Sequence, residues 1–367
     1  MSGQDRLFIV TDEQISPARA STGRALIWAP ALLLVIVALI QTLGRNGLMP
    51  EIADSWRPTL YAWAFFCTCY CAAQVVRDGE QGKRRLFVVP ATLFVVSMVF
   101  FPLVFGLTIA FSDWNLSSVD GQKFNGLDNI REMWGDPFYW NALGNMVLYT
   151  LAILVEYAIA LGLALLLNSQ IRARKFFRVA FLLPLMLSPV AVSWMVGKSL
   201  FESRFGPIAR VIRWFTGESP SFYGDPETAM LMIMMMDAWT FIPFMMIMLL
   251  AGLQAIPRDI VEASRMDGAT PWQTFKEVTF PLMLPVSITA IMIRIIFKLK
   301  LADIVINITS GGPGGATDTV TSFIFREYRD RSNVGYGTML AMVYLVFIVI
   351  GFTIFIKVAA RWMKPRY

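Results

Sequence analysis

The sequence predicts an all-α polytopic membrane protein with about eight transmembrane helices. Hydrophobic residues account for 56% of its 367 residues and charged residues for only 16%, whereas a soluble domain has about 25% charged residues. Several apolar runs also reach the length of roughly twenty residues that crosses a bilayer as a helix. Both observations argue against a soluble globular protein.

Apolar runs divide the chain into eight expected spans, which polar or charged segments separate. A short charged segment, R-D-G-E-Q-G-K-R-R, joins the first two spans to the other six. We therefore expect an N-terminal region of residues 1–85, with a polar tail and two additional helices, and a six-helix core of residues 86–367. The expected spans are residues 25–43, 59–76, 86–111, 142–168, 179–201, 228–252, 284–306 and 338–360.

Basic residues mark alternate connections and indicate how the chain is oriented. Taken together, the two tails and the connections 77–85, 169–178 and 254–283 are richer in Lys and Arg per residue than the other connections taken together, and residues 112–141 are net acidic. Because cytoplasmic connections are enriched in Lys and Arg, we expect both termini and residues 254–283 on the cytoplasmic side. The formal net charge of +6 is thus explained without a nucleic-acid-binding face.

The sequence lacks the residues that most enzymes and metal sites use. It contains no histidine, and its three cysteines lie together in the apolar run F-F-C-T-C-Y-C-A-A, where we interpret them as packing residues. No nucleophile motif, no clustered carboxylates and no G-x-x-x-x-G-K-[ST] phosphate loop occur. We therefore expect neither an enzyme nor a cofactor bound by this chain, and we interpret Gly311–Gly315 as a turn that ends a span.

A polar stretch, V-E-A-S-R-M-D-G-A-T-P-W-Q-T-F-K-E-V-T-F-P, interrupts two apolar runs near residues 257–281. Pro257 can open a first short helix, in which Arg258 and Arg265 each lie within reach of Glu262. Gly268 follows that helix and is suited to a left-handed C-terminal cap. The pattern therefore predicts one short helix that ends in a tight turn.

A second short helix is expected directly after this turn. Thr270 and Gln273 have the spacing of a capping box, with a proline at the first helical position. We expect the helix to reach about Val278, where Pro281 and Pro285 would end it. Neither short helix could cross a bilayer. The pair is either a peg that docks on a cytoplasmic partner or an ordinary cover over the ends of the spans.

The residues of this stretch resemble a signature of one transporter family. Glu262-Ala263-Ser264 and Asp267-Gly268-Ala269, followed by Phe275 and Pro281, resemble the E-A-A…D-G-A…F…L-P signature of ABC-importer permeases, with Ser264 in place of Ala and Phe280 in place of Leu. The segment T-S-G-G-P, Thr309–Pro313, resembles the T-x-G-G-P segment of the maltose-type and glycerol-phosphate-type inner-membrane permeases. The resemblance covers roughly residues 86–367.

This resemblance implies a function and a set of partners. The polar stretch would be a coupling helix pair that docks on a separate ATPase subunit, which binds ATP and Mg. Two ATPase subunits, a second permease subunit in a heterodimer, an extracytoplasmic solute-binding protein and a sugar-type substrate are implied, in a bacterial inner membrane. The implied ATPase-coupling residues are Glu262, Ala263, Ser264, Asp267, Gly268 and Ala269.

Ionisable residues inside apolar spans are costly and mark candidate substrate contacts. Asp237 lies beside Trp239, a combination that suits sugar hydroxyls and ring stacking. Lys300 and Leu301 fall where the maltose-type permeases have polar substrate-facing residues. A lysine at this position suits an anionic sugar. If Lys300 instead pairs with Asp303, three residues further on, its charge is neutralised and a neutral sugar is the alternative. The candidate substrate-binding residues are Asp237, Trp239, Lys300, Leu301 and Asn307.

Other observations leave two interpretations open. Lys198, Arg294 and Lys298 are also expected within spans, where they snorkel or form ion pairs. Charges at this depth could alternatively serve as a relay in an ion-coupled secondary transporter or a channel, and neither of these needs a cytoplasmic peg. Dependence of uptake on an ATPase, as opposed to an ion gradient, separates the two classes.

Overall fold

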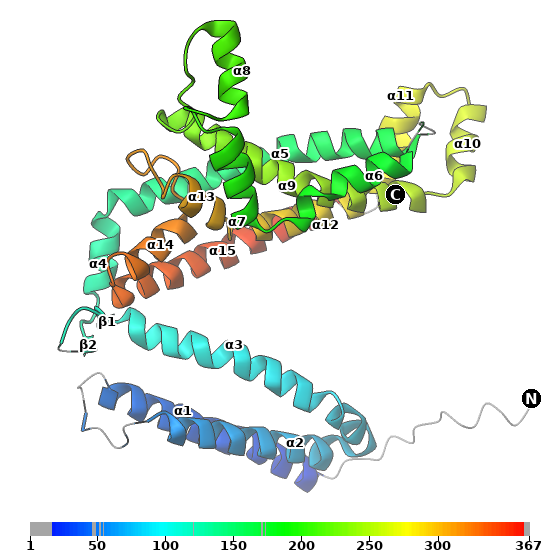
Figure 1. Ribbon diagram of the computed structural model, residues 1–367. Coiled ribbons are helices and arrows are strands. Elements are labelled where there is room, and N and C mark those ends of the chain that lie inside the picture. Colours follow the sequence, from blue (N-terminus) through cyan, green and yellow to red (C-terminus); the bar gives the residue numbers. More distant parts are fainter. Residues whose placement is uncertain are drawn as a thin grey trace, which may run out of the picture. The chain divides into compact units, whose positions relative to one another are not determined.

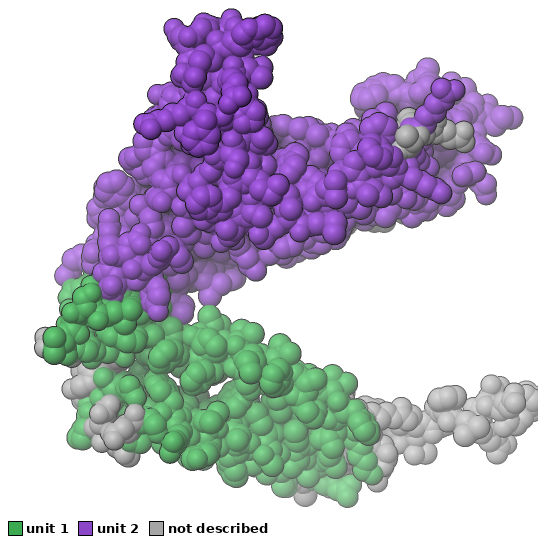
Figure 2. Space-filling model, viewed as in Figure 1, with its two compact units in different colours: residues 1–129, 334–339 green, residues 130–333, 340–367 purple. Residues whose placement is uncertain are grey.

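A computed structural model of the chain describes residues 17–45, 49–50, 53, 55–119, 121–169, 172 and 174–362. Two compact units make up the structure (Figure 2). The first consists of residues 1–129 and 334–339, and the second of residues 130–333 and 340–367. The boundary that we expected at residue 85 stays a prediction; the helix that follows it, α3 (Val89–Ala110), lies in the first unit.

The predicted fold class is confirmed. The chain is 79% helical with almost no strands. Among the described residues, seven helices are long and apolar enough to cross a membrane, and a bent pair of helices raises this to as many as eight. Each expected span corresponds to a helix or to the bent pair, but the span expected at residues 284–306 is wrong at its end: the helix ends at Lys298, and a separate helix begins at Asp303.

The first unit is built from three long helices. Helices α1 (Pro17–Arg45) and α2 (Arg57–Leu86) form a hairpin, which the Gln41 amide closes by donating to the carbonyls of Ala53 and Ser55 at 3.0 and 2.7 Å. Helix α2 continues through the charged segment that we had expected to be a linker. Trp63 of α2 stacks on Phe100 of α3, with ring centroids 5.8 Å apart.

The end of α3 leads into the short strands β1 (Ser112–Asp113) and β2 (Lys123–Phe124), which pair antiparallel. The buried Asn129 amide donates to the carbonyls of Ala110 and Ser112 at 2.8 and 3.0 Å. Asn129 is the second residue of α4 (Asp128–Gly135) and the last residue of this part of the first unit.

The second unit is organised around α5 (Pro137–Asn168), α9 (Pro226–Ala255) and α12 (Phe280–Lys298), which contact one another (Figure 1). Small residues let these helices approach closely. Ala160 and Ala164 of α5 are fully buried, and a Cβ added at Gly252 of α9 would lie 3.0 Å from Val286 of α12. The remaining elements of this unit are α6 (Arg174–Leu182), η2 (Pro184–Met186), α7 (Pro189–Val192), η3 (Ser193–Leu200), α8 (Pro207–Thr216), α10 (Arg258–Met266), α11 (Pro271–Gln273), η4 (Thr274–Thr279), α13 (Asp303–Ile308), α14 (Val320–Arg329) and α15 (Val334–Trp362), whose first residues belong to the first unit.

The span expected at residues 179–201 is not a straight helix, which corrects our prediction. Residues Arg174–Met186 and Pro189–Leu200 meet at a bend of 99°. The cause is local: Pro189 disfavours helical backbone at Ser188, which is extended and caps the second segment by accepting from the Ala191 N–H at 3.2 Å. Periodicity alone could not reveal this bend, because both segments are apolar.

Four charged side chains form a closed ionic cluster among α5, α9 and α12, which we call the buried quartet: Glu156, Asp237, Arg294 and Lys298. Arg294 Nε lies 2.7 Å from one Glu156 oxygen, and Lys298 Nζ lies 2.8 Å from the other. Both cations also bind the Asp237 carboxylate. All four are buried, so of the two alternatives expected for Arg294 and Lys298, snorkelling or ion pairing, the structure has ion pairing. Two acids balance two bases.

The G-G-P-G-G segment forms a turn, as predicted. Gly311 and Gly314 have φ angles of +84° and +60°, which side chains adopt only at a cost. Gly311 differs from Gly314 in its surroundings. A Cβ added at Gly311 would lie 2.2 Å from an Asp318 carboxylate oxygen, and Asp318 is buried and held by Arg326 and Ser322. A Cβ at Gly314 would meet nothing within 4 Å.

We expect Gly311→Ala to destabilise the protein more than Gly314→Ala. Both changes carry the backbone strain of about 1–2 kcal/mol, but only Gly311→Ala forces a buried carboxylate to move, at a further cost of about 1–3 kcal/mol. Thermal unfolding of the detergent-solubilised variants measures the difference. Equal unfolding midpoint temperatures for the two variants would show that the Asp318 side chain can move away from the added Cβ without cost.

We expect Arg294→Met to destabilise the second unit by about 3–5 kcal/mol, because it leaves two buried carboxylates with one cation. Adding Glu156→Met restores equal charge, so the double variant should be more stable than Arg294→Met alone. Chemical denaturation of the single and double variants in one detergent tests this. A double variant that loses the sum of the two single losses would contradict a coupled cluster.

Candidate functional site

The polar stretch forms a helical hairpin in the second unit, at one end of α9 and α12 (Figure 1). Helix α10 ends at Met266, and Gly268 follows with a φ of +83°. The Gly268 N–H donates to the Arg265 carbonyl and the Ala269 N–H to the Ser264 carbonyl, both at 3.0 Å. The predicted left-handed turn is therefore present.

The second arm of the hairpin begins with the predicted capping box. The Thr270 hydroxyl accepts from the Gln273 N–H at 3.3 Å, and the Gln273 side chain accepts from the Thr270 N–H at 2.8 Å. The hydroxyls of Ser264 and Thr274 lie 3.2 Å apart and join the two arms. Ser264, one of the implied coupling residues, thus stabilises the hairpin by a hydrogen bond between its two arms.

The predicted end of the second arm is wrong. Helix α11 continues through the π-helical η4 into α12, so that residues Pro271–Lys298 form one uninterrupted span. Pro281 lies at the start of α12, and Pro285 is accommodated inside it. A π-helix widens the turn and relaxes the i to i−4 register that a proline would otherwise clash with. The hairpin is consequently continuous with a core helix.

The hairpin exposes large apolar side chains beside charged ones. Met266 is 89% exposed and Trp272 is 69% exposed, and Trp272 stacks on Phe275 with ring centroids 5.6 Å apart. Glu262 is exposed, and within the described residues no ion pair joins it to Arg258 or Arg265. The implied coupling residues Ala263, Asp267 and Gly268 are also exposed, and Ala269 is half-buried.

The five predicted substrate-binding residues occupy two different environments. Asp237 belongs to the buried quartet, and Leu301 lies in an apolar cluster with Tyr149 and Ile304. By contrast, Trp239 is 43% exposed and Lys300 is exposed. No ion pair joins Lys300 to Asp303 in the described part of the chain, so the contact that was the alternative to an anionic sugar is not observed there.

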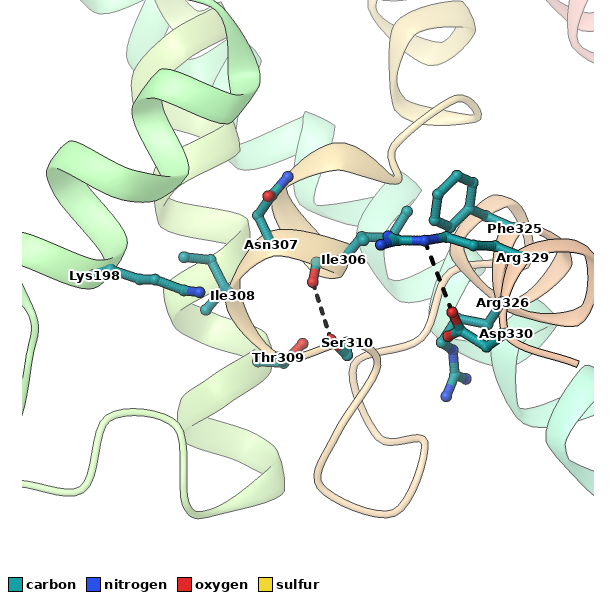
Figure 3. A pocket seen from close by; sticks show the side chains of 10 residues that line it. All are labelled: Lys198, Ile306, Asn307, Ile308, Thr309, Ser310, Phe325, Arg326, Arg329 and Asp330. Atoms are coloured by element: carbon teal, nitrogen blue, oxygen red, sulfur yellow. Dashed lines mark hydrogen bonds and ion pairs between the residues drawn. The ribbon is translucent and has the colours of Figure 1, made fainter.

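The fifth residue, Asn307, lines a pocket of about 410 Å³ at the end of α13 (Figure 3). Its amide donates to the Asp303 carbonyl at 2.7 Å. We call this cavity the α13 pocket. Its other lining residues come from η3, from α13 itself, from the T-S-G-G-P turn and from α14 with the residue after it. They are Lys198, Ile306, Ile308, Thr309, Ser310, Phe325, Arg326, Arg329 and Asp330.

Basic side chains dominate the charge of the α13 pocket. Lys198 and Arg329 extend toward α13 from two sides (Figure 3). Arg329 lies 4.0 Å from Asp330, and Arg326 pairs with Asp318 below the pocket. Burial raises the pKa of the Asp318 carboxyl, and the Arg326 guanidinium opposes that rise.

Lys198 has a different partner. Its ammonium lies 4.3 Å from the centre of the Trp194 ring, and no carboxylate among the described residues lies within ion-pair distance of it. Of the two alternatives expected for Lys198, snorkelling or an ion pair, the ion pair is not observed among the described residues.

Sequence reasoning missed two features of this region. Glu156 was not assigned to the quartet. Arg294 and Lys298 are four residues apart and so share one face of a helix, and two buried cations on one face need carboxylate partners on the neighbouring helices. Arg326 and Arg329 were not linked to Asn307, because the pocket joins segments that are distant in sequence. Among the described residues, no group of three or more acidic or cysteine side chains could hold a metal ion.

Comparison with known proteins identifies related chains. The trehalose/maltose transport system permease protein MalF of Thermococcus litoralis is 32% identical over 290 residues, which cover 78% of this chain and 96% of that relative. The sulfoquinovosyl glycerol transport system permease protein SmoG of Agrobacterium fabrum is 32% identical over 267 residues, which cover 72% of this chain and 86% of that relative.

Solved structures show the same fold. The crystal structure of a bacterial ABC transporter involved in the import of the acidic polysaccharide alginate contains a chain that aligns with a TM-score of 0.66 at 20% identity, over 77% of this chain and 98% of that one. The family model of the inner membrane component of binding-protein-dependent transport systems matches residues 156–367. The chain therefore belongs to this family of multi-pass membrane permeases.

Proposed function

We propose that the chain forms half of the translocation pathway of an ATP-driven importer for a sugar or a sugar derivative, which a solute-binding protein delivers. The chain is a transport subunit and not an enzyme. Two separate ATPase subunits bind ATP and Mg and supply the energy, and a second, different permease subunit completes the pathway. Both termini lie in the cytoplasm. The sugar class is supported by relatives named for trehalose/maltose and for sulfoquinovosyl glycerol transport.

The helical hairpin of α10 and α11 is the observation that carries this proposal. Its first arm, α10, is too short to cross a membrane, and a positive-φ glycine, a capping box and the Ser264–Thr274 contact hold the two arms in one shape. Met266 and Trp272 leave its tip apolar and exposed. Exposed apolar side chains gathered with unpaired charges are typical of a surface that a protein partner covers. We assign that partner as the ATPase, with Glu262 at the contact.

The hairpin is connected to the helical core through α12. The second arm runs without a break into α12, and α12 carries Arg294 and Lys298, which bind Glu156 of α5 and Asp237 of α9. A displacement of the hairpin by the ATPase would therefore move α12 and, through the buried quartet, the two helices bound to it. A rigid connected element of this kind can transmit coupling between sites.

The buried quartet also bears on the alternative, an ion-coupled secondary transporter or a channel. A proton or cation relay needs a carboxylate that ions can reach and that changes partners. Glu156 and Asp237 are instead buried and each bind two cations. This arrangement favours a structural role and leaves the hairpin as the route of energy input.

We expect Gly268→Pro to uncouple ATP hydrolysis from transport. Proline cannot adopt the φ of +83° and would remove the N–H that donates to Arg265. Glu262→Lys should have the same effect by reversing the charge at the contact. Uptake and ATPase activity of the reconstituted importer measure both. We expect uptake to fall at least roughly tenfold, as expected for loss of about 1.4 kcal/mol of interaction.

The matched control for the charge reversal is Glu218→Lys, an exposed acid next to α8 and outside the hairpin. It should leave uptake unchanged. Normal uptake by both hairpin variants, with the protein present in the membrane, would rule out the coupling role.

For substrate contact, we propose that Lys300, Trp239 and Asn307 meet the sugar, and that Asp237 and Leu301 position them from the adjacent core. Lys300 is exposed and lacks an acidic partner among the described residues. A free cation at this position suits an anionic group on the sugar, such as a carboxylate or sulfonate.

Lys300→Ala should weaken transport of an acidic sugar more than that of its neutral parent, by roughly fivefold to tenfold for an interaction of about 1–1.5 kcal/mol. Lys300→Arg keeps the charge and should retain most of the preference. Competitive uptake of D-glucuronate and D-glucose by the reconstituted importer provides the comparison. Equal losses for the two sugars would show that the Lys300 charge is not used.

A further inference from the structure

The α13 pocket contains basic side chains in addition to Asn307, the proposed sugar contact. Its volume of about 410 Å³ falls in the range of about 300–1,000 Å³ that is typical of small-molecule sites. Polar groups from four separate segments converge on it: Lys198 from η3, Asn307 from α13, Ser310 from the turn and Arg329 from α14. A cavity that four segments build is a feature of the fold and not an accident of one loop.

The charges of this pocket do not balance. Lys198, Arg326 and Arg329 line it, against Asp330 as the one acidic lining residue. Counting Asp318, which pairs with Arg326 from below, three positive charges face two negative ones, which leaves a net charge of +1. Arg326 Nε is buried and has no hydrogen-bond partner among the described residues. The excess positive charge of the pocket lies on Lys198, which pairs with no carboxylate among the described residues.

The arrangement of these donors matches a particular kind of ligand. Lys198 and Arg329 both line the pocket and approach α13 from two sides (Figure 3), so an acidic sugar in the pocket would meet positive charge on either side of this helix. Guanidinium groups bind planar carboxylates in a bidentate manner, and an ammonium group adds a compact charge. Asn307 keeps an amide oxygen and one N–H unused, and Ser310 can still accept a hydrogen bond. These groups suit sugar hydroxyls.

We propose that the α13 pocket is a second contact site for the carboxylate or sulfonate group of an acidic sugar, separate from Lys300, which does not line it, and that Lys198 and Arg329 are its anion-binding residues. This inference rests on the proposed function, since it assigns a substrate class to the same permease. It also explains why Lys198 is held against Trp194, 4.3 Å from its ring, and not against a carboxylate: the acid that it would meet is part of the substrate.

The test uses the assembled importer in nanodiscs without ATP. Binding of D-glucuronate, D-galacturonate, D-mannuronate and sulfoquinovose is compared with that of D-glucose, D-galactose and D-mannose. We expect saturable binding of at least one acidic sugar and at least roughly tenfold weaker binding of it to the double variant Lys198→Gln/Arg329→Gln, as for loss of charge-assisted hydrogen bonds. Added salt should also weaken it, because Arg329 is exposed.

Arg210→Gln is the matched control, because it removes an arginine charge from α8 outside the pocket. It should bind the acidic sugar as the unmodified protein does. The proposal is overturned if no acidic sugar binds saturably, or if the double variant binds it unchanged. ATP-dependent sugar uptake distinguishes the two possible failures. If only the pocket proposal is wrong, the importer still takes up a sugar with ATP. If the proposed function is wrong, neither the unmodified protein nor any variant takes up a sugar with ATP.

Discussion

The ion pairs of the buried quartet are the interaction on which the rest of the core depends. Glu156, Asp237, Arg294 and Lys298 connect α5, α9 and α12 inside an apolar unit. Isolated charges would be prohibitively costly there, but two acids and two bases with shared hydrogen bonds offset much of the desolvation cost. Apolar packing can slide along a helix face, whereas these directional bonds fix one register among the three helices.

Because this register is fixed, a movement of the hairpin can be transmitted to the helical core. Helix α12 begins as the second arm of the hairpin and ends at the quartet, so one rigid element joins an exposed apolar tip to the centre of the helical core. Beyond the quartet, Lys298 is followed closely by Lys300 and then by α13 with Asn307. In the proposed importer, energy input, core register and substrate contact thus lie along one continuous stretch of chain, residues 258–308.

Much of this arrangement could be predicted from the sequence, because the signals are local. Apolar run length identified the spans, and Gly268, Thr270 and Gln273 identified the turn and the capping box, since both depend on backbone chemistry within a few residues. The bend between Met186 and Pro189 and the fusion of α11 with α12 were missed, because they depend on how prolines are accommodated in three dimensions.

The partners of Asp237 and the basic lining of the α13 pocket were missed for a related reason. Both require knowing which helices are neighbours.

The most direct test of the account is to identify what touches the hairpin in the membrane. A photo-crosslinking residue placed at Met266, which is 89% exposed, is activated in native membranes, and the adduct is identified by mass spectrometry. The account predicts an adduct with a separate subunit that carries a Walker motif. If no such adduct forms while the chain, purified alone, transports a sugar without ATP, then the hairpin is an ordinary interfacial cover and the coupling account is wrong.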